Sequence, residues 1–262
     1  MLRPQDTATR ETKRLDGIWS FRQDVAAEGR DQRWFAGPVP EAGSMAVPAS
    51  FNELTTDSAV REFSGDAWYQ TTVRIPRGWA GQRIVVYVES ATHRATVWAN
   101  DMEVGFHEGG YLPFEVDVTA QAAPGAELRL TICVNNTLSF QSLPPGVMEA
   151  PYGGPPIQRY FHDFYNYAGL HRSVWLAAMP PVRFDDVTVT TDVDGADGIV
   201  RSRAVTTADA AVTQILRDAA GVEVARADGP RVELRVPNAT LWQPGIGYLY
   251  DLELQAVADG EV

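Results

Sequence analysis

The densest set of chemically useful side chains lies between Tyr160 and Gly169, in a stretch rich in aromatic residues. This stretch places His162, Asp163 and Asn166 among Tyr and Phe side chains. Imidazole, carboxylate and amide groups bind polar ligands and position or transfer protons. Pro and Gly residues crowd the sequence just before it, which predicts a loop, and loops on a rigid scaffold concentrate binding groups. The spacing alone leaves a purely structural role open.

The signatures of several large enzyme classes are absent from the sequence. It contains no Gly-rich phosphate loop, no G-x-S-x-G elbow and no H-E-x-x-H motif. The four histidines have spacings that fit no common zinc site, and Cys133 is a lone cysteine; the histidines are His93, His107, His162 and His171. We interpret each histidine first as a structural or surface group, and we predict no metal and no cofactor. The 34 acidic residues offer many carboxylate pairs, but choosing a glycosidase pair needs the distance between the groups.

Short runs of alternating or β-branched residues must position these groups. No stretch of 12 or more residues keeps a helical spacing of apolar positions without Gly or Pro, whereas strand-like runs are frequent. In the segment 127–134 the residues Leu128, Leu130, Ile132 and Val134 share one face. The segments 95–99 and 103–107 flank Asn100-Asp101, which predicts a hairpin. Further runs include 68–75, 83–88, 114–118 and 173–177. The expected fold class is all-β, built from β-sandwiches.

The distribution of Pro residues suggests two domains. Met179-Pro180-Pro181 interrupts the strand pattern, and six more short strand-like runs follow it. We therefore expect a first domain at 1–180 and a smaller second sandwich at 181–262. The last of these runs ends at Asp259-Gly260, a strong hairpin dipeptide with only two residues after it. We interpret the second sandwich as incomplete, lacking its last strand.

Tryptophans and other large aromatic residues sit in or beside the strand patterns. They are Trp19, Phe21, Trp34, Trp68, Trp79, Trp98 and Trp175. Core packing is the simpler interpretation, and stacking against the apolar face of a sugar is the alternative.

The charge balance excludes some partners. The formal net charge is −12, with 22 basic residues and no basic block, which disfavours nucleic-acid binding. No apolar run approaches the ~18 residues of a membrane span, so no membrane association is expected. No signal peptide is visible, and together with the lone cysteine this predicts a cytoplasmic location.

Three motifs stand out along the chain: Asp163-Phe164-Tyr165-Asn166-Tyr167-Ala168-Gly169, Asp16-Gly17-Ile18-Trp19-Ser20-Phe21 and Gly109-Gly110-Tyr111-Leu112-Pro113-Phe114. Together they resemble the N-terminal part of the β-glucuronidases of glycoside hydrolase family 2. The first motif is the most specific, and β-galactosidases and β-mannosidases share the other two. The resemblance implies a jelly-roll, sugar-binding-like domain followed by an immunoglobulin-like sandwich.

The resemblance also implies where the catalytic and the substrate-binding residues lie. In the family a (β/α)₈ barrel follows and carries both catalytic glutamates, so no catalytic residue is expected in these 262 residues. The family's equivalent of Asp163 reaches the active site and binds sugar hydroxyls, and His162 is expected to orient that loop. The implied substrate is a β-D-glucuronide, hydrolysed with retention, with no cofactor. Relatives of this kind are often homo-oligomers.

Two other functions stay open from the sequence. A stand-alone carbohydrate-binding module would also suit a jelly roll, and it would bind sugar without a barrel. Another family 2 glycosidase, a β-galactosidase or a β-mannosidase, would share the broader motifs.

Overall fold

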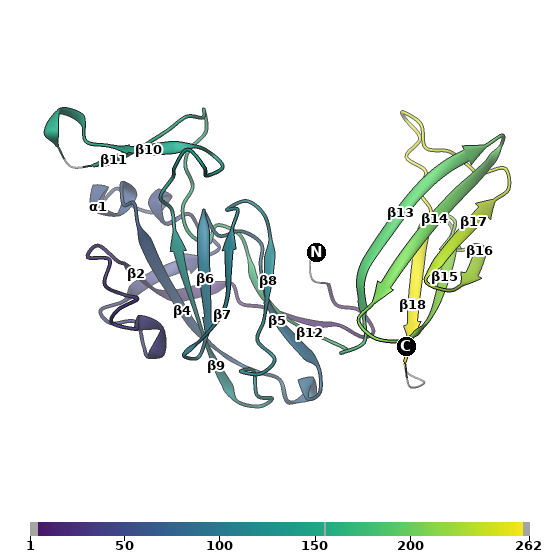
Figure 1. Cartoon of the computed structure of the whole chain (residues 1–262), viewed down its shortest axis with the longest axis horizontal. Helices are drawn as coiled ribbons and strands as arrows, with labels where there is room; N and C mark the ends of the chain where they lie inside the picture. Colours follow the sequence, from purple (N-terminus) through teal and green to yellow (C-terminus); the bar gives the residue numbers. More distant parts are fainter. Residues whose placement is uncertain (1–4, 155, 259–262) are drawn as a thin grey trace. The chain divides into compact units, whose positions relative to one another are not determined.

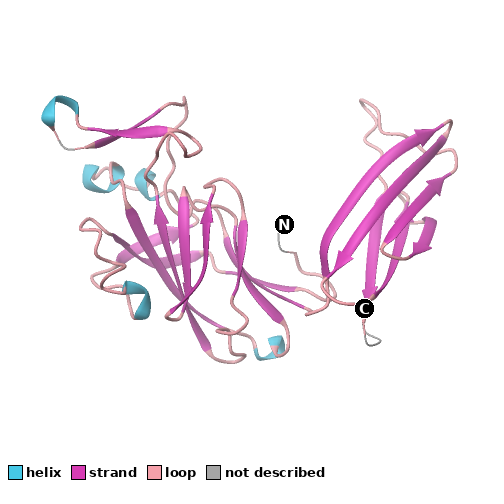
Figure 2. Cartoon of the chain, viewed as in Figure 1, coloured by secondary structure: helices cyan, strands magenta, loops and turns pink. Residues whose placement is uncertain are grey.

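The computed structural model describes residues 5–154 and 156–258, and these form two compact units (Figures 1 and 2). Unit 1 comprises Met1–Met179 and unit 2 comprises Pro180–Val262. Strands dominate both units, and the described helical turns are short, which confirms the prediction of an all-β fold. The predicted hairpin dipeptide Asp259-Gly260 lies outside the described residues.

The larger sheet of unit 1 has six antiparallel strands. In spatial order they are β3 (Gly43–Val47), β2 (Gly17–Gln23), β4 (Asp66–Arg74), β9 (Glu127–Asn135), β6 (Arg94–Ala99) and β7 (Met102–Glu108). The predicted hairpin is the β6–β7 pair, and its turn residue Asn100 has a positive φ of 55°. Asn tolerates this left-handed conformation better than most residues do, which explains why the turn forms there.

A four-stranded sheet completes the first sandwich. Its order is β1 (Glu11–Arg14), β12 (Val174–Met179), β5 (Arg83–Val88) and β8 (Phe114–Asp117). The main core draws on both sheets, with Leu128, Leu130, Ile132 and Val134 from β9 all buried, as their alternation predicted. Side chains of opposite faces alternate along a strand, so β9 gives its other face to the outside of the sandwich.

A second, smaller cluster lies on that outer face of the six-stranded sheet. Trp68 of β4 stacks on Trp98 of β6 at 5.2 Å between ring centroids, and Phe35 stacks on Trp98 at 5.0 Å. Trp34 and Phe35 belong to the 3₁₀ turn η1 (Trp34–Ala36), on the segment that follows β2. Core packing is therefore confirmed for Trp34, Trp68 and Trp98.

The region 136–170 is more ordered than the sequence indicated. The Pro and Gly residues before Tyr160 predicted a loop, but β10 (Gly146–Glu149) and β11 (Ile157–Tyr160) pair as an antiparallel hairpin. The Pro and Gly residues fall before β10 and in the connection, where the turn η4 (Pro151–Gly153) forms, so they do not remove ladder bonds. The remaining short helical elements are η2 (Phe51–Glu53), α1 (Ser58–Arg61) and η3 (Arg77–Trp79).

Unit 2 is a small sandwich of two three-stranded sheets. One sheet has the order β13 (Phe184–Asp194), β14 (Asp197–Thr206), β17 (Arg231–Val236). The other has the order β16 (Glu223–Asp228), β15 (Ala211–Arg217), β18 (Asp251–Val257). Its core centres on Leu216, Leu234 and Val236.

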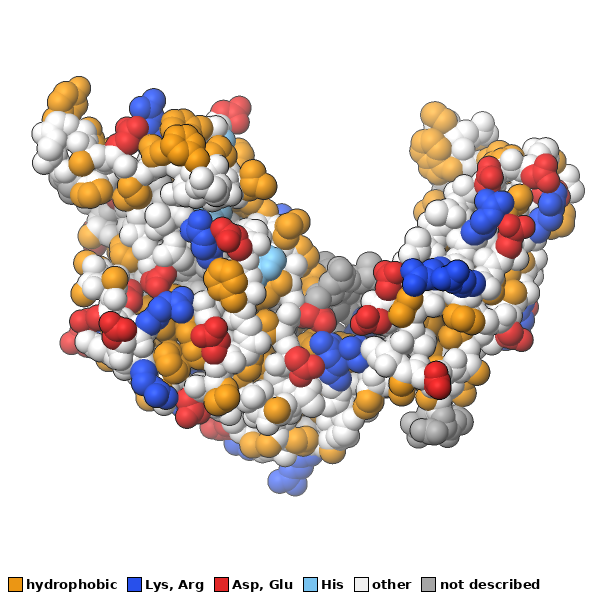
Figure 3. Space-filling model, in the orientation of Figure 1, with side chains coloured by type: hydrophobic (Ala, Val, Ile, Leu, Met, Phe, Trp, Pro, Cys, Tyr) orange, Lys and Arg blue, Asp and Glu red, His pale blue; other side chains and the backbone are white. Residues whose placement is uncertain are grey.

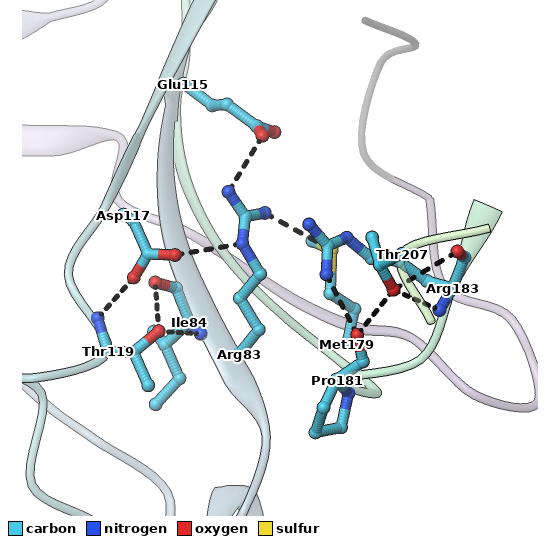
Figure 4. Close-up of polar contacts among 9 residues, drawn as sticks. All are labelled: Arg83, Ile84, Glu115, Asp117, Thr119, Met179, Pro181, Arg183 and Thr207. Atoms are coloured by element: carbon cyan, nitrogen blue, oxygen red, sulfur yellow. Dashed lines mark hydrogen bonds and ion pairs between the residues drawn. The ribbon is translucent and has the colours of Figure 1, made fainter. Parts of the chain in front are cut away.

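Polar contacts join β5 to β8 in unit 1, and Thr207 to Pro181 in unit 2 (Figure 4). In unit 1, Arg83 Nε donates to Asp117 at 2.9 Å and its Nη2 donates to Glu115 at 3.1 Å. Burial acts to raise the pKa of Asp117, but the hydrogen bonds from Thr119 and Arg83 outweigh it and hold that pKa below its usual value. In unit 2, the Thr207 hydroxyl donates to the Pro181 carbonyl at 2.8 Å.

Candidate functional site

The candidate segment is an irregular connection between β11 and β12, as the sequence predicted. Its first half, from Phe161 to Phe164, is largely exposed, and its second half is buried. The two halves therefore have different tasks: the buried half fixes the loop on the sandwich, and the exposed half carries the groups that face solvent.

Asn166 is the central anchor of the buried half. Its side-chain Oδ1 accepts a hydrogen bond from His93 Nε2 at 2.8 Å, and its backbone oxygen accepts from Asn52 Nδ2 at 3.0 Å. The Tyr165 hydroxyl donates to the backbone oxygen of Asn52 at 3.1 Å. A buried polar group must find partners, and here three segments distant in sequence satisfy one another. Asn166 thus serves as an anchor of the loop.

Ala168 and Gly169 bind the loop to the sandwich through their backbone. The amide of Ala168 donates to Ser50 Oγ at 3.0 Å, and the amide of Thr92 donates to the Gly169 oxygen at 3.1 Å. Gly169 has a φ of +93°, and a Cβ placed there would overlap the Tyr69 hydroxyl. Only glycine combines this backbone conformation with so close an approach, which explains the last residue of the motif.

Asp163 lies at the exposed end of this anchored loop. Its side chain is exposed, and it makes no hydrogen bond or ion pair with the described part of the chain. It is the only acidic residue between Tyr160 and Arg172. Its carboxylate is therefore free to accept hydrogen bonds from a ligand.

His162 is packed as an aromatic ring. Its imidazole stacks on Tyr160 at 4.5 Å and on Phe164 at 4.1 Å between ring centroids. Both ring nitrogens are buried and make no hydrogen bond with the residues the structure describes. The ring supports the loop on either side of Asp163, and it makes no hydrogen bond to the Asp163 carboxylate.

Tyr111 joins the two family motifs in space. Its ring meets His93 at 5.8 Å, His171 at 5.7 Å and Phe164 at 6.3 Å, each edge to face. Gly110 precedes it, and a Cβ at Gly110 would lie 2.8 Å from Thr92 Cγ2, so the backbone approach there requires glycine. The Gly-Gly-Tyr run and the loop at 163–169 therefore meet around one tyrosine.

Burial lowers the pKa of the two inner histidines, His93 and His171. It lowers the pKa of His93, against the opposing effect of the bond to Asn166. Burial likewise lowers the pKa of His171, and the charge of Arg172 adds to that effect. His107 packs separately, stacked on Phe114 at 4.4 Å.

In the described ranges 5–154 and 156–258 no group of three or more His, Cys, Asp or Glu side chains could hold a metal ion.

Sequence reasoning selected Asp163, His162 and Asn166 but missed the residues that hold them, which are Asn52, His93, Tyr111 and His171. Tyr111 belongs to the motif Gly109–Phe114, which was recognised in the sequence. That motif alone did not indicate that Tyr111 contacts the loop at 163–169. His93 was interpreted as a structural or surface group, but its sequence position gave no link to the loop, and neither did that of Asn52.

Comparison with known families decides the classification. The model for "Glycosyl hydrolases family 2, sugar binding domain" matches residues 12–180, and the model for "Glycosyl hydrolases family 2" matches residues 182–262. The chain belongs to glycosyl hydrolase family 2. This confirms the resemblance, and the two matched ranges meet where the Pro residues interrupt the strand pattern.

Two similar proteins are β-glucuronidases from different organisms. A β-glucuronidase of Paenibacillus borealis is 45% identical over 261 residues, which is 97% of this chain and 44% of that protein. A β-glucuronidase of Sus scrofa is 40% identical over 282 residues, covering 98% of this chain and 43% of that protein. The chain therefore spans less than half the length of these relatives. A β-galactosidase or a β-mannosidase is not favoured.

Solved structures agree with the fold. The Ruminococcus gnavus β-glucuronidase superposes with a TM-score of 0.93 at 36% identity, covering 98% of this chain and 44% of that one. A Lactobacillus rhamnosus β-glucuronidase superposes with a TM-score of 0.92 at 40% identity, covering 99% of this chain and 44% of that one. One structure of the Ruminococcus gnavus protein is described as a complex with D-glucuronic acid.

Proposed function

We propose that this chain is part of a β-glucuronidase that hydrolyses β-D-glucuronides with retention of configuration. The similar proteins named β-glucuronidase, one of them described with bound D-glucuronic acid, support this substrate class. The acid/base and the nucleophile are assigned to a catalytic barrel of the longer protein, as the family resemblance implies. A retaining glycosidase uses two carboxyl groups about 5 Å apart for these roles. The same protein acts as a homo-oligomer.

In this proposal the chain contributes Asp163 to the substrate site. The observation that carries it is an exposed carboxylate with no partner among the described residues, on a loop whose other half is buried and bonded to two distant segments, at 50–52 and at His93. An ionised carboxylate accepts from vicinal sugar hydroxyls, and the charge strengthens each bond. Because the backbone of the loop is already anchored, it loses less conformational entropy on binding the sugar than a flexible loop would.

Hydrolysis of p-nitrophenyl β-D-glucuronide tests the proposal. The 262-residue chain is assayed beside the longer protein encoded by its gene, with Asp163→Asn in the longer form. Activity is expected in the longer form alone, with Asp163→Asn lowering kcat/KM about tenfold to a hundredfold, the cost of one or two charged hydrogen bonds. Asp101→Asn, an exposed carboxylate in the β6–β7 turn, is the matched control.

Two results contradict the proposal. Turnover by the 262-residue chain itself would place a catalytic pair within the two sandwiches. An Asp163→Asn enzyme with unchanged kcat/KM would remove Asp163 from the substrate site while leaving the reaction assignment intact.

A further inference from the structure

The outer face of the six-stranded sheet holds a cavity of about 320 Å³ in unit 1, outside the candidate loop. None of the residues that line it belongs to the segment 160–172. Its size is at the lower end of the range of ligand pockets, enough for one sugar ring and little more. The proposed function does not use this cavity.

The register of four adjacent strands creates the cavity wall. Cys133 of β9, Thr96 of β6 and Phe106 of β7 stand opposite one another in one row across the sheet. Because directly paired residues point to the same face, the whole row lines the same side. Figure 3 shows this side of unit 1, with basic and acidic side chains close together over β6 and β7.

A second row beside it is polar. Asn135 of β9 lies between Asp66 of β4 and Arg94 of β6, and Arg94 pairs in turn with Glu108 of β7. Arg30 arrives from the segment that covers the tryptophan cluster, and its guanidinium lies 5.5 Å over the ring of Trp98. The cavity therefore has one row that ends in the aromatic ring of Phe106, one polar row, and the guanidinium of Arg30.

The acceptor groups around the cavity are already occupied. Asp66 Oδ1 accepts from Asn135 Nδ2 at 2.6 Å, and Asp66 Oδ2 lies 3.5 Å from Arg30 Nε. Glu108 Oε1 accepts from Arg94 Nε at 2.9 Å. These bonds leave few acceptors for a ligand, so the cavity does not favour a cation.

The donors are only partly used. Arg30 donates through Nη2 to Thr96 Oγ1 at 3.0 Å, and Arg94 donates through Nη1 to the Thr137 oxygen at 2.8 Å. Arg30 Nη1 and Arg94 Nη2 make no bond with the described residues. Both arginines line the cavity, each is paired with its own carboxylate, and each keeps N–H groups that can donate to a carboxylate ligand.

Phe106 places an exposed aromatic ring at the cavity. Its ring is 60% exposed although it stands on a sheet face beside a cavity. An exposed ring of this kind offers an apolar platform for a flat, partly apolar ligand. We propose that this cavity is a binding site for a uronic acid residue, with the sugar ring against Phe106 and its carboxylate toward Arg30 and Arg94.

A titration of the 262-residue chain, labelled with nitrogen-15, tests the proposal by amide chemical shifts. The probes are methyl β-D-glucuronide, methyl β-D-glucoside, which lacks the carboxylate, and acetate, which lacks the ring. Asp163→Asn is present throughout, so that binding at the proposed substrate loop does not contribute. The expected result is shifts at Thr96, Phe106 and Asn135, with the glucuronide binding about tenfold more tightly than either fragment.

Matched variants assign the two contacts. Arg94→Gln and Phe106→Ala are each expected to weaken glucuronide binding about tenfold. Arg74→Gln is the control for the arginine, because Arg74 also bonds one carboxylate and one backbone oxygen, those of Glu127 and Gly125. Trp242→Ala is the control for the ring, since Trp242 is 63% exposed in unit 2.

Several outcomes overturn the proposal. If the glucoside bound as tightly as the glucuronide, the arginines would not recognise the carboxylate. If acetate bound as tightly as the glucuronide, the cavity would bind a simple anion without recognising the sugar ring. Shifts confined to residues 160–172, or no shifts at all, would leave no ligand for the cavity. If Arg94→Gln loses the folded spectrum, Arg30→Gln replaces it, because Arg30 lies outside the strands.

Discussion

His162 acts through the shape of its ring, because neither nitrogen has a partner in the described structure while the ring packs against Tyr160 and Phe164. His162→Phe is therefore expected to leave the free energy of unfolding unchanged within about 0.5 kcal/mol. His162→Ala removes two ring contacts, each worth about 0.5–1.5 kcal/mol, and is expected to lower that energy by about 1–3 kcal/mol. Urea unfolding followed by tryptophan fluorescence measures both.

The pair of variants separates packing from imidazole chemistry. A Phe variant as unstable as the Ala variant would mean that the ring nitrogens matter for folding. A Phe variant of normal stability with a much lower kcat/KM in the longer protein would instead give the imidazole a part in the reaction.

Position 169 tolerates only glycine, because of its backbone conformation and its close neighbours. Its φ of +93° and the closeness of the Tyr69 hydroxyl leave no place for a Cβ. We expect Gly169→Ala to lower the free energy of unfolding of unit 1 by about 2–4 kcal/mol, from backbone strain and overlap together. Gly78→Ala is the control in the same urea experiment, since a Cβ there meets no atom within 4 Å. Equal losses in both variants would refute the argument.

At the scale of elements, the loop 160–171 is held by side chains from distant segments. Asn52 Nδ2 donates to the backbone oxygen of Asn166, and Asn52→Ala leaves that buried acceptor unpaired. The expected loss is about 1–3 kcal/mol, concentrated in the loop. Hydrogen exchange read by mass spectrometry should therefore speed up in peptides from 160–171 and stay unchanged in β4 and β9. Faster exchange across the whole of unit 1 would contradict a local tether.

Strand identity was predictable because it is a local property. The alternation in 127–134 gave β9 and its buried face, and the turn Asn100-Asp101 gave the β6–β7 hairpin. The hairpin β10–β11 was missed because its two strands have four residues each and lie among Pro and Gly residues. Short strands carry too few alternating positions to stand out from a loop.

The candidate site was predictable only in part, because many of the contacts that hold it join residues far apart in the sequence. Asp163 and its neighbours stood out as a polar group among aromatic residues in one short segment. Several of their supports lie far away in the sequence: Asn52 is 114 residues from Asn166, and His93 is 73 residues from it. Contacts of this kind follow from how the strands order themselves in the sheets, and alternation along a single strand does not fix that order.

At the scale of the whole molecule, the histidines are confined to one unit. His93, His107, His162 and His171 all precede residue 179, so unit 2 contains none. Burial lowers the pKa of His93 and of His171 below the value in an unfolded chain, about 6.5. As the pH falls through that value, the unfolded state of unit 1 takes up protons that its folded state does not. Unit 1 is therefore expected to lose stability below about pH 6.5, and above it the stability contributed by these groups is complete.

Tryptophan fluorescence isolates this effect, because six of the seven tryptophans precede residue 179 and the seventh, Trp242, is 63% exposed. The thermal midpoint read by fluorescence should fall between pH 7.5 and pH 5.5. In unit 2 the carboxyl groups with a lowered pKa, such as Asp197 and Glu253, lose their stabilising charge only at more acidic pH. The fluorescence midpoint should thus move while the unit 2 component of far-ultraviolet circular dichroism stays in place, and His93→Gln should reduce the movement. A midpoint that is constant across this range would mean that the folded His93 and His171 bind protons as readily as the unfolded chain does.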